Sequence, residues 1–397
     1  MQPLAGLRIL DLTRLLPGPA ATMHLADYGA EVIKIEDTAE GDYLRAFPPL
    51  VEDEDGRPIN PAYGALNRGK RSIRIDLKQA AGRDLLLRLV DRADALIEGF
   101  RPGVLVRLEL GWEVLHARNP RLVLCSISGY GQDGPMSQVA GHDINYCAMA
   151  GVLEQTRAGG VPALPSLQIG DTLGGTLSAL SALLIALLSA QRTGVGRHVD
   201  VAMTDGVLAH HIFAHAMLDA SMTPVAEQTL LTGGVACYRI YECADARFVA
   251  LGALEPKFWQ AFCTTTGLPE LAKRHWAFGE APGSAAAQKT TERVAAHLRT
   301  RARDEWIALF DGADACLTPV LAPAEALAHP LFTERGRIHR RGGVTAVGPL
   351  AIMSEHHFAQ APAPRAGADT EALLRELGLS DDDIARLRAD GVVREQD

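Results

Sequence analysis

The chain has 397 residues, of which 47% are hydrophobic and 22% charged, a composition typical of a soluble globular protein with two or three domains. Its 39 Lys and Arg residues and 48 Asp and Glu residues give a net charge of −9. This acidic balance argues against nucleic acid as the main partner, because phosphate backbones require a basic surface. It permits a small anionic ligand bound at a local basic patch.

The six cysteines are scattered, and none belongs to a Cys-x-x-Cys pair. Most have apolar neighbours and are predicted to be small buried side chains of a protein in a reducing compartment, here the cytoplasm. The adjacent His210 and His211 would point about 100° apart on a helix, and no other spacing indicates zinc, so no metal is expected. The N-terminus lacks the apolar core of a secretory signal, so none is expected.

The N-terminal part begins with a strand–helix–strand unit. Residues 7–12 are predicted to form a strand, Pro17-Gly18-Pro19 a turn and residues 20–28 a helix that ends before Gly29, and residues 31–35 form the second strand. Parallel strands need a crossover of this kind, so the unit predicts a parallel sheet.

The same alternation continues. Strands are expected at residues 72–76, 95–98 and 122–128, and helices at 80–93 and 112–118. This succession predicts a Rossmann-like, doubly wound α/β domain. The polar insertion Pro48–Pro61 interrupts it with an acidic run at residues 52–55. We predict a solvated loop without a catalytic role, because neighbouring carboxylates repel one another and favour water.

Residues 172–191 carry no charge and are long enough to cross a bilayer. The segment contains several Gly, Ser and Thr residues, and no second such segment exists in the chain. A helix buried on all sides by protein is therefore preferred to a membrane span. A strand at residues 198–202 and a helix at residues 204–220 are predicted to follow.

From about residue 225 the pattern changes to an α+β type. Strands are expected at residues 236–241 and 247–253, and helices at 257–266, 286–300 and 303–312. Residues 342–348 are rich in turn formers. The tail predicts helices at 370–377 and 380–390, the second opened by a capping box of Ser380 and Asp383.

These patterns divide the chain into four segments. A large α/β domain is expected at residues 1–205, a linker helix at 206–230, a small α+β domain at 231–325 and a return to the large domain at 326–397.

Two features bear on nucleotide binding. The turn at residues 15–19 contains two prolines, which lack the backbone donors that a pyrophosphate needs, so nicotinamide binding is disfavoured although Glu36 ends the second strand. The densest basic cluster, Asn67–Arg71, permits two interpretations, a surface turn or a clamp for phosphate.

Two polar motifs contain candidates for proton transfer. His142 lies in Gly-His-Asp-Ile-Asn-Tyr (141–146), and Asp171 lies in Gly-Asp-Thr-Leu-Gly-Gly (170–175), directly before the apolar helix. A histidine and a carboxylate are the groups that two-sided proton transfer needs. Both residues are also common helix caps, and local pattern leaves both interpretations open.

A set of motifs spread along nearly the whole chain resembles the family III coenzyme A transferase superfamily. They are Pro17-Gly-Pro19, residues 29–35, residues 67–72, Glu98-Gly-Phe-Arg-Pro-Gly103, Gly129-Tyr-Gly131, Arg192-Thr-Gly194 and the tail at residues 379–384. The resemblance implies a nucleotide-type large domain, a smaller α+β domain and two identical chains interlocked like links. It also implies an acyl-CoA substrate, no further cofactor and an active site shared between chains, with no nucleic-acid or membrane partner expected.

The superfamily contains two chemistries. Its transferases use an aspartate at the position of Asp171 as a nucleophile, whereas its 2-methylacyl-CoA racemases use that residue as an acid and base. The racemases add the histidine of Gly-His-Asp-Ile-Asn-Tyr and a glutamate that Glu255, in Gly252-Ala-Leu-Glu-Pro256, resembles. The resemblance implies proton transfer by His142 and Asp171, with Glu255 orienting the histidine. Local pattern equally permits Glu255 to be an acid at the start of the helix expected at residues 257–266. A racemase is favoured, and a transferase is the alternative because the insertion at residues 42–63 is transferase-like.

The resemblance also implies contacts with the CoA moiety. Lys78 and Arg107 match positions that contact the nucleotide, Ile75 and Gly99 match backbone contacts, and Tyr146 matches a residue near the thioester.

Two further expectations concern the ligand. Asp37 stands where racemases carry a basic residue, so part of the adenine site differs. Backbone N–H groups of residues 172–174 are expected to stabilise an enolate, with Gly174 and Gly175 allowing close approach of the ligand.

Overall fold

The computed structural model describes residues 2–395, which divide into two compact units. The first comprises residues Met1–Ala150, Pro165–His210 and Pro330–Asp397, and the second comprises Gly151–Leu164 and His211–His329. Residues 151–164 thus group with the second unit, whereas the sequence placed them in the large domain. The expected linker at 206–230 is divided at His210. Residues 1, 396 and 397 of the expected domains lie outside the described residues.

Within residues 2–395, the first unit contains a seven-stranded sheet in the order β10-β7-β6-β1-β2-β5-β16. Its strands are β1 (Arg8–Leu12), β2 (Glu31–Glu36), β5 (Arg71–Ile75), β6 (Ala95–Glu98), β7 (Val123–Ser128), β10 (His198–Ala202) and β16 (Val393–Arg394). All neighbours pair in parallel except β16, which is antiparallel to β5, so the predicted parallel sheet is confirmed. The chain winds outward from β1 in both directions, which creates a switch point between β1 and β6.

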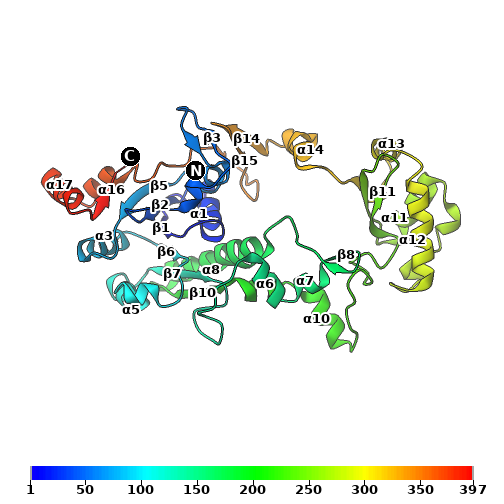
Figure 1. The fold of residues 1–397 in the computed structure, drawn as a ribbon, viewed down its shortest axis with the longest axis horizontal. Helices are drawn as coiled ribbons and strands as arrows, with labels where there is room; N and C mark the ends of the chain where they lie inside the picture. Colours follow the sequence, from blue (N-terminus) through cyan, green and yellow to red (C-terminus); the bar gives the residue numbers. More distant parts are fainter. Residues whose placement is uncertain (1, 396–397) are drawn as a thin grey trace. The chain divides into compact units, whose positions relative to one another are not determined.

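Each face of this sheet has its own core. Alternate strand residues point to opposite faces, so Leu10 and Leu96 belong to one core and Ile9 and Ile97 to the other. The first face is covered by α3 (Ala80–Val90), α5 (Trp112–Arg118), α16 (Thr370–Glu376) and α17 (Asp381–Ala389). The second is covered by α1 (Pro17–Asp27) and α8 (Ser178–Thr193). Figure 1 shows the red C-terminal helices beside the blue strand β5.

Several helix ends differ from expectation. Helix α1 begins at Pro17, so the predicted turn at residues 17–19 is wrong. A proline in the first turn of a helix loses no intrahelical bond, because those N–H groups have no partner there. The predicted capping box at α17 is confirmed: Asp383 N–H donates to Ser380 Oγ at 3.2 Å, and Ser380 N–H donates to Asp383 Oδ2 at 3.2 Å.

The single helix expected at residues 204–220 is two helices, α9 (Met203–Ala209) and α10 (Ile212–Asp219). At the break, His210 Nδ1 lies 2.7 Å from the Gly206 carbonyl oxygen. A side chain that binds this oxygen competes with the backbone for it, which favours a helix end here.

Two segments expected to be loops contain hairpins. In the insertion, β3 (Val51–Glu52) pairs with β4 (Pro58–Ile59), between the 3₁₀ turn η1 (Tyr43–Ala46) and α2 (Pro61–Leu66). In the turn-rich segment, β14 (Ile338–Arg341) pairs with β15 (Val344–Val347) around Gly342 and Gly343, both with positive φ. Two such glycines form a tight hairpin turn, so the pattern was compatible with strands on either side.

The apolar segment forms one helix from Gly170 to Thr193, of which residues Gly170–Leu177 (η2) are π-helical. By length and composition this helix could cross a membrane, and 44% of its most apolar window is buried. Within this chain the helix is not buried on all sides, because Ile185 is 71% exposed. Because the segment has no charged residues, its sequence does not indicate which face of the helix packs against the rest of the chain.

The second unit is of α+β type. Its described residues include a three-stranded antiparallel sheet of β11 (Tyr238–Glu242), β12 (Phe248–Gly252) and β13 (Leu317–Pro319). The main helices are α11 (Pro256–Thr266), α12 (Ala285–Leu298) and α13 (Arg303–Leu309). Trp259, Phe262 and Trp306 are buried between sheet and helices and account for much of this core.

Shorter elements complete both units. They are α4 (Val104–Arg107), α6 (Asp143–Met149), α7 (Val152–Gln155), β8 (Arg157–Ala158), β9 (Val161–Pro162), η3 (Pro269–Leu271), η4 (Trp276–Phe278), α14 (Pro323–Ala328) and α15 (Pro330–Thr333).

Candidate active site

His142 and Asp171 both lie in the first unit, at the starts of two helices. His142 is the N-cap residue of α6, and its backbone N–H is bound by Asn145 Oδ1 at 3.0 Å. Its exposed imidazole has no hydrogen-bond partner among residues 2–395. The capping interpretation therefore holds for the backbone of His142, while its side chain is available for chemistry.

Asp143 joins the two helices. Its Oδ1 accepts a hydrogen bond from the Asp171 backbone N–H at 3.0 Å. A Cβ atom at Gly170 would lie 3.0 Å from the same oxygen, a tight contact, so glycine at that position favours the close approach. The sequence analysis assigned no role to Asp143; the only signal for one was an acidic residue directly after a helix cap.

Burial, with a further contribution from the neighbouring carboxylate of Asp143, raises the pKa of Asp171 to about 6, while His142 opposes the shift. Asp143 and His142 therefore both lie within electrostatic reach of Asp171. A carboxyl group with such a pKa can hold and release a proton near neutral pH, which suits an acid–base residue.

The helix around Asp171 is tightly packed. A Cβ at Gly174 would lie 2.2 Å from the Met203 carbonyl oxygen, and one at Gly175 would lie 2.7 Å from Pro17 Cβ. The two glycines therefore serve helix packing, and their expected role in ligand approach remains a prediction. Thr176 Oγ1 also donates to the Pro17 carbonyl at 2.9 Å. π-Helical turns are common at functional sites.

The expected enolate donors are partly used within the chain. The Thr172 N–H donates to the Gln168 carbonyl at 2.9 Å, so this group is not available in the conformation described. The start of the helix still places its positive end at Asp171, where a developing anion is favoured.

Tyr146 packs behind the same motif. Its hydroxyl donates to the Gly141 carbonyl at 2.6 Å, and its ring meets Tyr130 edge-to-face at 5.3 Å. Burial raises its pKa to about 12, with a further contribution from Asp171. Tyr146 thus holds the residue before His142 in place, and its predicted proximity to a thioester remains a prediction.

The four other predicted CoA contacts lie at the carboxyl ends of β5 and β6. Ile75 ends β5 and is buried, whereas Lys78 and Arg107 are exposed. Gly99 follows β6, and a Cβ there would lie 3.9 Å from Thr13 Cγ2, just beyond β1. Gly99 is thus at the switch point, where doubly wound sheets bind ligands. The contacts themselves remain predictions.

The basic cluster at residues 67–71 is neither a surface turn nor a phosphate clamp. Arg68 is buried and binds Asp27 through two hydrogen bonds of 2.8 and 2.6 Å. Lys70 Nζ is also buried and lies 3.0 Å from Asp11 Oδ2. These cations are neutralised inside the unit, which sequence spacing could not indicate because their partners lie far away in the chain.

Glu36 is likewise used internally. Its carboxylate accepts hydrogen bonds from Arg45 at 2.9 and 2.7 Å and from Ser72 at 3.0 Å. Asp37, the residue at which this chain differs from the racemase pattern, forms an ion pair with Arg14 and accepts the backbone N–H of Glu40 in the following turn.

A buried ion network lies at the ends of β1 and β2. Lys34 Nζ lies 3.0 Å from Asp42 Oδ2 and donates to the Thr13 carbonyl at 3.0 Å. Asp42 also accepts the backbone N–H of Leu15 at 3.3 Å, a residue with φ of 63°. The network therefore holds the loop between β1 and α1, which contacts the helix of Asp171 through Pro17.

Glu255 lies in the second unit as the N-cap residue of α11, and its exposed side chain forms no capping hydrogen bond. Its predicted role beside His142 remains a prediction. Among the described residues, no group of three or more His, Cys, Asp or Glu side chains is arranged to hold a metal.

The doubly wound sheet, with His142 and Asp171 at the starts of two helices, is that of an α/β protein. The family model of CoA-transferase family III matches residues 4–370, and the chain belongs to this family. It is 34% identical to human alpha-methylacyl-CoA racemase over 98% of this chain and 97% of that protein. It is 33% identical to acetyl-CoA:oxalate CoA-transferase of Acetobacter aceti, covering 94% and 96%. A crystal structure of a CaiB/BaiF family protein from Brucella suis matches with a TM-score of 0.82 and 29% identity, covering 95% and 99%.

Proposed function

We propose that this enzyme is a racemase or epimerase of 2-methylacyl-CoA thioesters. The observation that carries the proposal is the presence of Asp171, whose pKa is raised to about 6 by burial and by Asp143, within electrostatic reach of the exposed imidazole of His142. Removal of the proton beside a thioester needs a base on one face and an acid on the other. The full-length similarity to alpha-methylacyl-CoA racemase supports this assignment.

In the proposed reaction, neutral His142 or ionised Asp171 removes the proton from carbon 2. The thioester carbonyl accepts the electron pair as an enolate, and the conjugate acid of the other residue returns a proton on the opposite face. Glu255 would orient the imidazole, and Ile75, Lys78, Gly99, Arg107 and Tyr146 would bind the CoA moiety. No cofactor beyond that moiety is required.

A CoA-transferase is the second candidate, with Asp171 as a covalent nucleophile. The observation that favours it is the similarity to transferases, including 44% identity over 206 residues to succinate–glutarate CoA-transferase of Agrobacterium fabrum. That match spans 51% of this chain, so its support for the transferase reaction comes from about half of the molecule.

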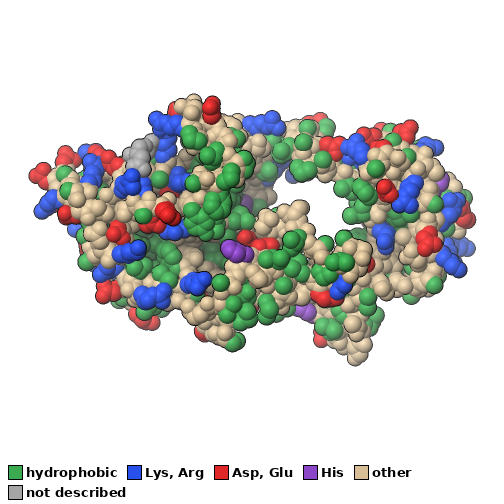
Figure 2. Space-filling view, in the orientation of Figure 1, with side chains coloured by type: hydrophobic (Ala, Val, Ile, Leu, Met, Phe, Trp, Pro, Cys, Tyr) green, Lys and Arg blue, Asp and Glu red, His purple; other side chains and the backbone are tan. Residues whose placement is uncertain are grey.

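We further propose that two chains interlock into a cytoplasmic homodimer. Apolar side chains are exposed on α8 and α10, namely Ile185, Leu188, Ile212 and Phe213. Large exposed apolar groups mark surfaces that a partner covers, and a second copy of the chain suits them better than a membrane. On the face shown in Figure 2, Lys and Arg side chains are interspersed with Asp and Glu, which disfavours nucleic acid as a partner.

Deuterium exchange distinguishes the two candidates. A 2-methylacyl-CoA is incubated with the enzyme in heavy water, and incorporation of label at carbon 2 is expected. If no label enters, and hydroxylamine traps an acyl adduct on Asp171 when donor and acceptor acids are supplied, the chain is a transferase.

Substitution His142→Ala gives a second test. Label incorporation should fall by roughly 10²–10⁴-fold, the usual contribution of a positioned general base. His357→Ala, at another exposed histidine, is the matched control and should exchange at the wild-type rate. A transferase would tolerate both substitutions.

A further inference from the structure

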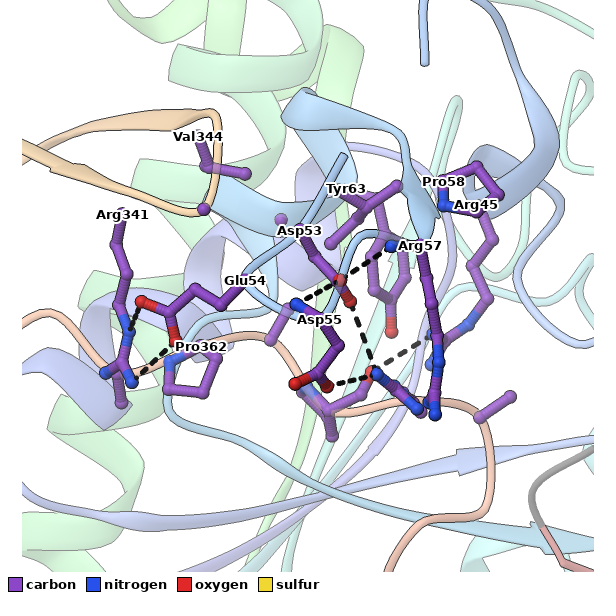
Figure 3. Close-up of a pocket in the computed structure, with 18 of the residues that line it drawn as sticks. Arg45, Asp53, Glu54, Asp55, Arg57, Pro58, Tyr63, Arg341, Val344 and Pro362 are labelled. Atoms are coloured by element: carbon purple, nitrogen blue, oxygen red, sulfur yellow. Dashed lines mark hydrogen bonds and ion pairs between the residues drawn. The ribbon is translucent and has the colours of Figure 1, made fainter. Parts of the chain in front are cut away.

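A cavity lies in the first unit, between the β3–β4 hairpin of the insertion and the segments around residues 341–344 and 360–366. Its volume is about 470 Å³, enough for a small organic ion. None of its lining residues belongs to the acid–base pair or to the predicted CoA contacts. Figure 3 shows charged side chains of the hairpin, such as Glu54, pointing toward Arg341 on the opposite segment.

The lining is rich in arginine. Within the described residues, five arginines and three acidic side chains line the cavity, which leaves a formal excess of two positive charges. Its remaining walls are mainly alanine and proline from residues 361–366. A pocket with apolar walls and guanidinium groups matches a small anion, because the planar guanidinium binds carboxylate or phosphate through paired hydrogen bonds.

Two of the arginines are part of the internal structure. Arg45 binds Glu36 and donates to the Pro364 carbonyl at 3.0 Å, and its guanidinium lies 4.0 Å from the centre of the Tyr63 ring. Arg74 donates to the carbonyls of Thr38 and Ala39 at 2.8 and 2.7 Å. Both therefore form a fixed wall of the cavity.

The contacts of Arg341 are exposed, whereas Arg365 is half-buried and pairs with Asp53 at 3.5 Å as well as with Asp55. Arg341 is held by Glu54 through bonds of 2.9 and 3.0 Å, as the dashed lines in Figure 3 mark. Arg365 is held by Asp55. The side chains of Glu54 and Asp55 are 53% and 68% exposed. Exposed ion pairs of this kind contribute only about 0–1 kcal/mol, so a ligand with two anionic groups can displace them.

We propose that this cavity binds a small dianion, a dicarboxylate or a phosphate, which replaces Glu54 and Asp55 at Arg341 and Arg365. The acidic tip of the hairpin occupies the guanidinium groups when the ligand is absent. Ligand and hairpin tip therefore compete for the same two cations.

The competition gives opposite expectations for two double variants. Calorimetric titration is carried out with inorganic phosphate and with succinate on the full-length protein at low salt. Arg341→Gln with Arg365→Gln should weaken binding by about tenfold or more, since hydrogen bonds to charged groups are lost. Glu54→Gln with Asp55→Asn should strengthen it several-fold, because the internal competitor is removed. Comparison of phosphate with succinate identifies which anion the cavity prefers.

Asp53 is left unchanged because its Oδ1 accepts the backbone N–H groups of Asp55 and Arg57 and shapes the hairpin turn. Arg118→Gln, which breaks another exposed ion pair of the first unit with Asp91, is the matched control and should bind like wild type. Thermal unfolding verifies that each variant is folded.

Hydrogen–deuterium exchange of the peptide covering residues 51–59 provides an independent measurement. Phosphate or succinate should increase exchange at the hairpin tip as its ion pairs are replaced, and chloride at equal ionic strength should have a smaller effect. Absence of binding, or equal affinity in wild type and both double variants, would overturn the proposal.

Discussion

Asp11 and Asp171 are both aspartates of the first unit, and the structure shifts their pKa values in opposite directions. Burial by itself would raise the pKa of Asp11, but Lys70, Lys34 and the hydroxyls of Thr13 and Thr22 together hold it well below its usual range. Asp171 has another carboxylate, Asp143, as its neighbour, so burial raises its pKa to about 6.

The two aspartates show that burial penalises the charged form of a carboxylate, whereas the neighbouring charges determine the direction in which its pKa finally shifts. A buried carboxylate that is matched by cations stabilises the fold. A buried carboxylate beside a second carboxylate has a raised pKa, so it can exchange a proton near neutral pH. The following predictions test this contrast.

The largest effect is expected from Asp11→Asn. The substitution leaves Lys70 and Lys34 buried without their shared anion, and removal of one partner from a buried pair typically costs about 3–5 kcal/mol. Urea unfolding at pH 7 measures the loss. Because the folded pKa of Asp11 is lowered, its contribution is present above the unfolded pKa and is lost on acidification, so the difference from wild type should shrink at low pH.

Asp171→Asn is the matched comparison and should show the opposite sign. The raised pKa of Asp171 means that its contribution to stability is present below the unfolded pKa and is lost as the pH rises through about 6. The variant should therefore be at least as stable as wild type at pH 7.5, with no advantage below pH 4, while label exchange is lost. Protein concentration is kept constant, since association affects stability. Equal destabilisation by both substitutions would contradict the contrast.

Gly174→Ala should have the next largest effect. The added Cβ would lie 2.2 Å from the Met203 carbonyl oxygen, so the helix that holds Asp171 must move, at a typical cost of about 1–3 kcal/mol. Unfolding and label exchange should both be impaired. Gly252→Ala is the control for stability, because its only near contact would be an ordinary 3.9 Å. A Gly174→Ala protein with wild-type stability would show that the packing is loose.

The smallest effect is the pH dependence of proton exchange. Asp171 removes a proton only when ionised, so the rate in the direction that uses it as base should fall about tenfold for each pH unit below a pKa of about 6. The rate constant kcat/KM for one enantiomer, measured between pH 4.5 and 8, tests this. A limb near the ordinary aspartate pKa would show that Asp143 and burial do not act as described.

Much of the fold followed from local pattern. The strands of the parallel sheet were predicted because buried strands are short apolar runs separated by helices of suitable length. The motifs holding His142 and Asp171 were also found from sequence, and the family resemblance is shown by the match over residues 4–370. The α17 capping box was predicted because its two partners are only three residues apart.

The errors concern features that depend on distant residues. The basic cluster at residues 67–71 was misassigned because Asp11 and Asp27, which neutralise it, lie some forty to sixty positions earlier in the chain. The packing of Gly174 against Met203 was not predicted, because the two residues are far apart in the chain. The apolar helix showed no charge on any side, so its exposed face at Ile185 could not be predicted.

The sequence by itself therefore determined the parallel sheet, the family and the two residues proposed for proton transfer, because these depend on periodicity and on short motifs. Only the tertiary structure decided which charges neutralise one another and that Asp143 is the neighbour of Asp171. Both are consequences of folding, since a pKa depends on burial and on charges that are brought together from separate segments of the chain.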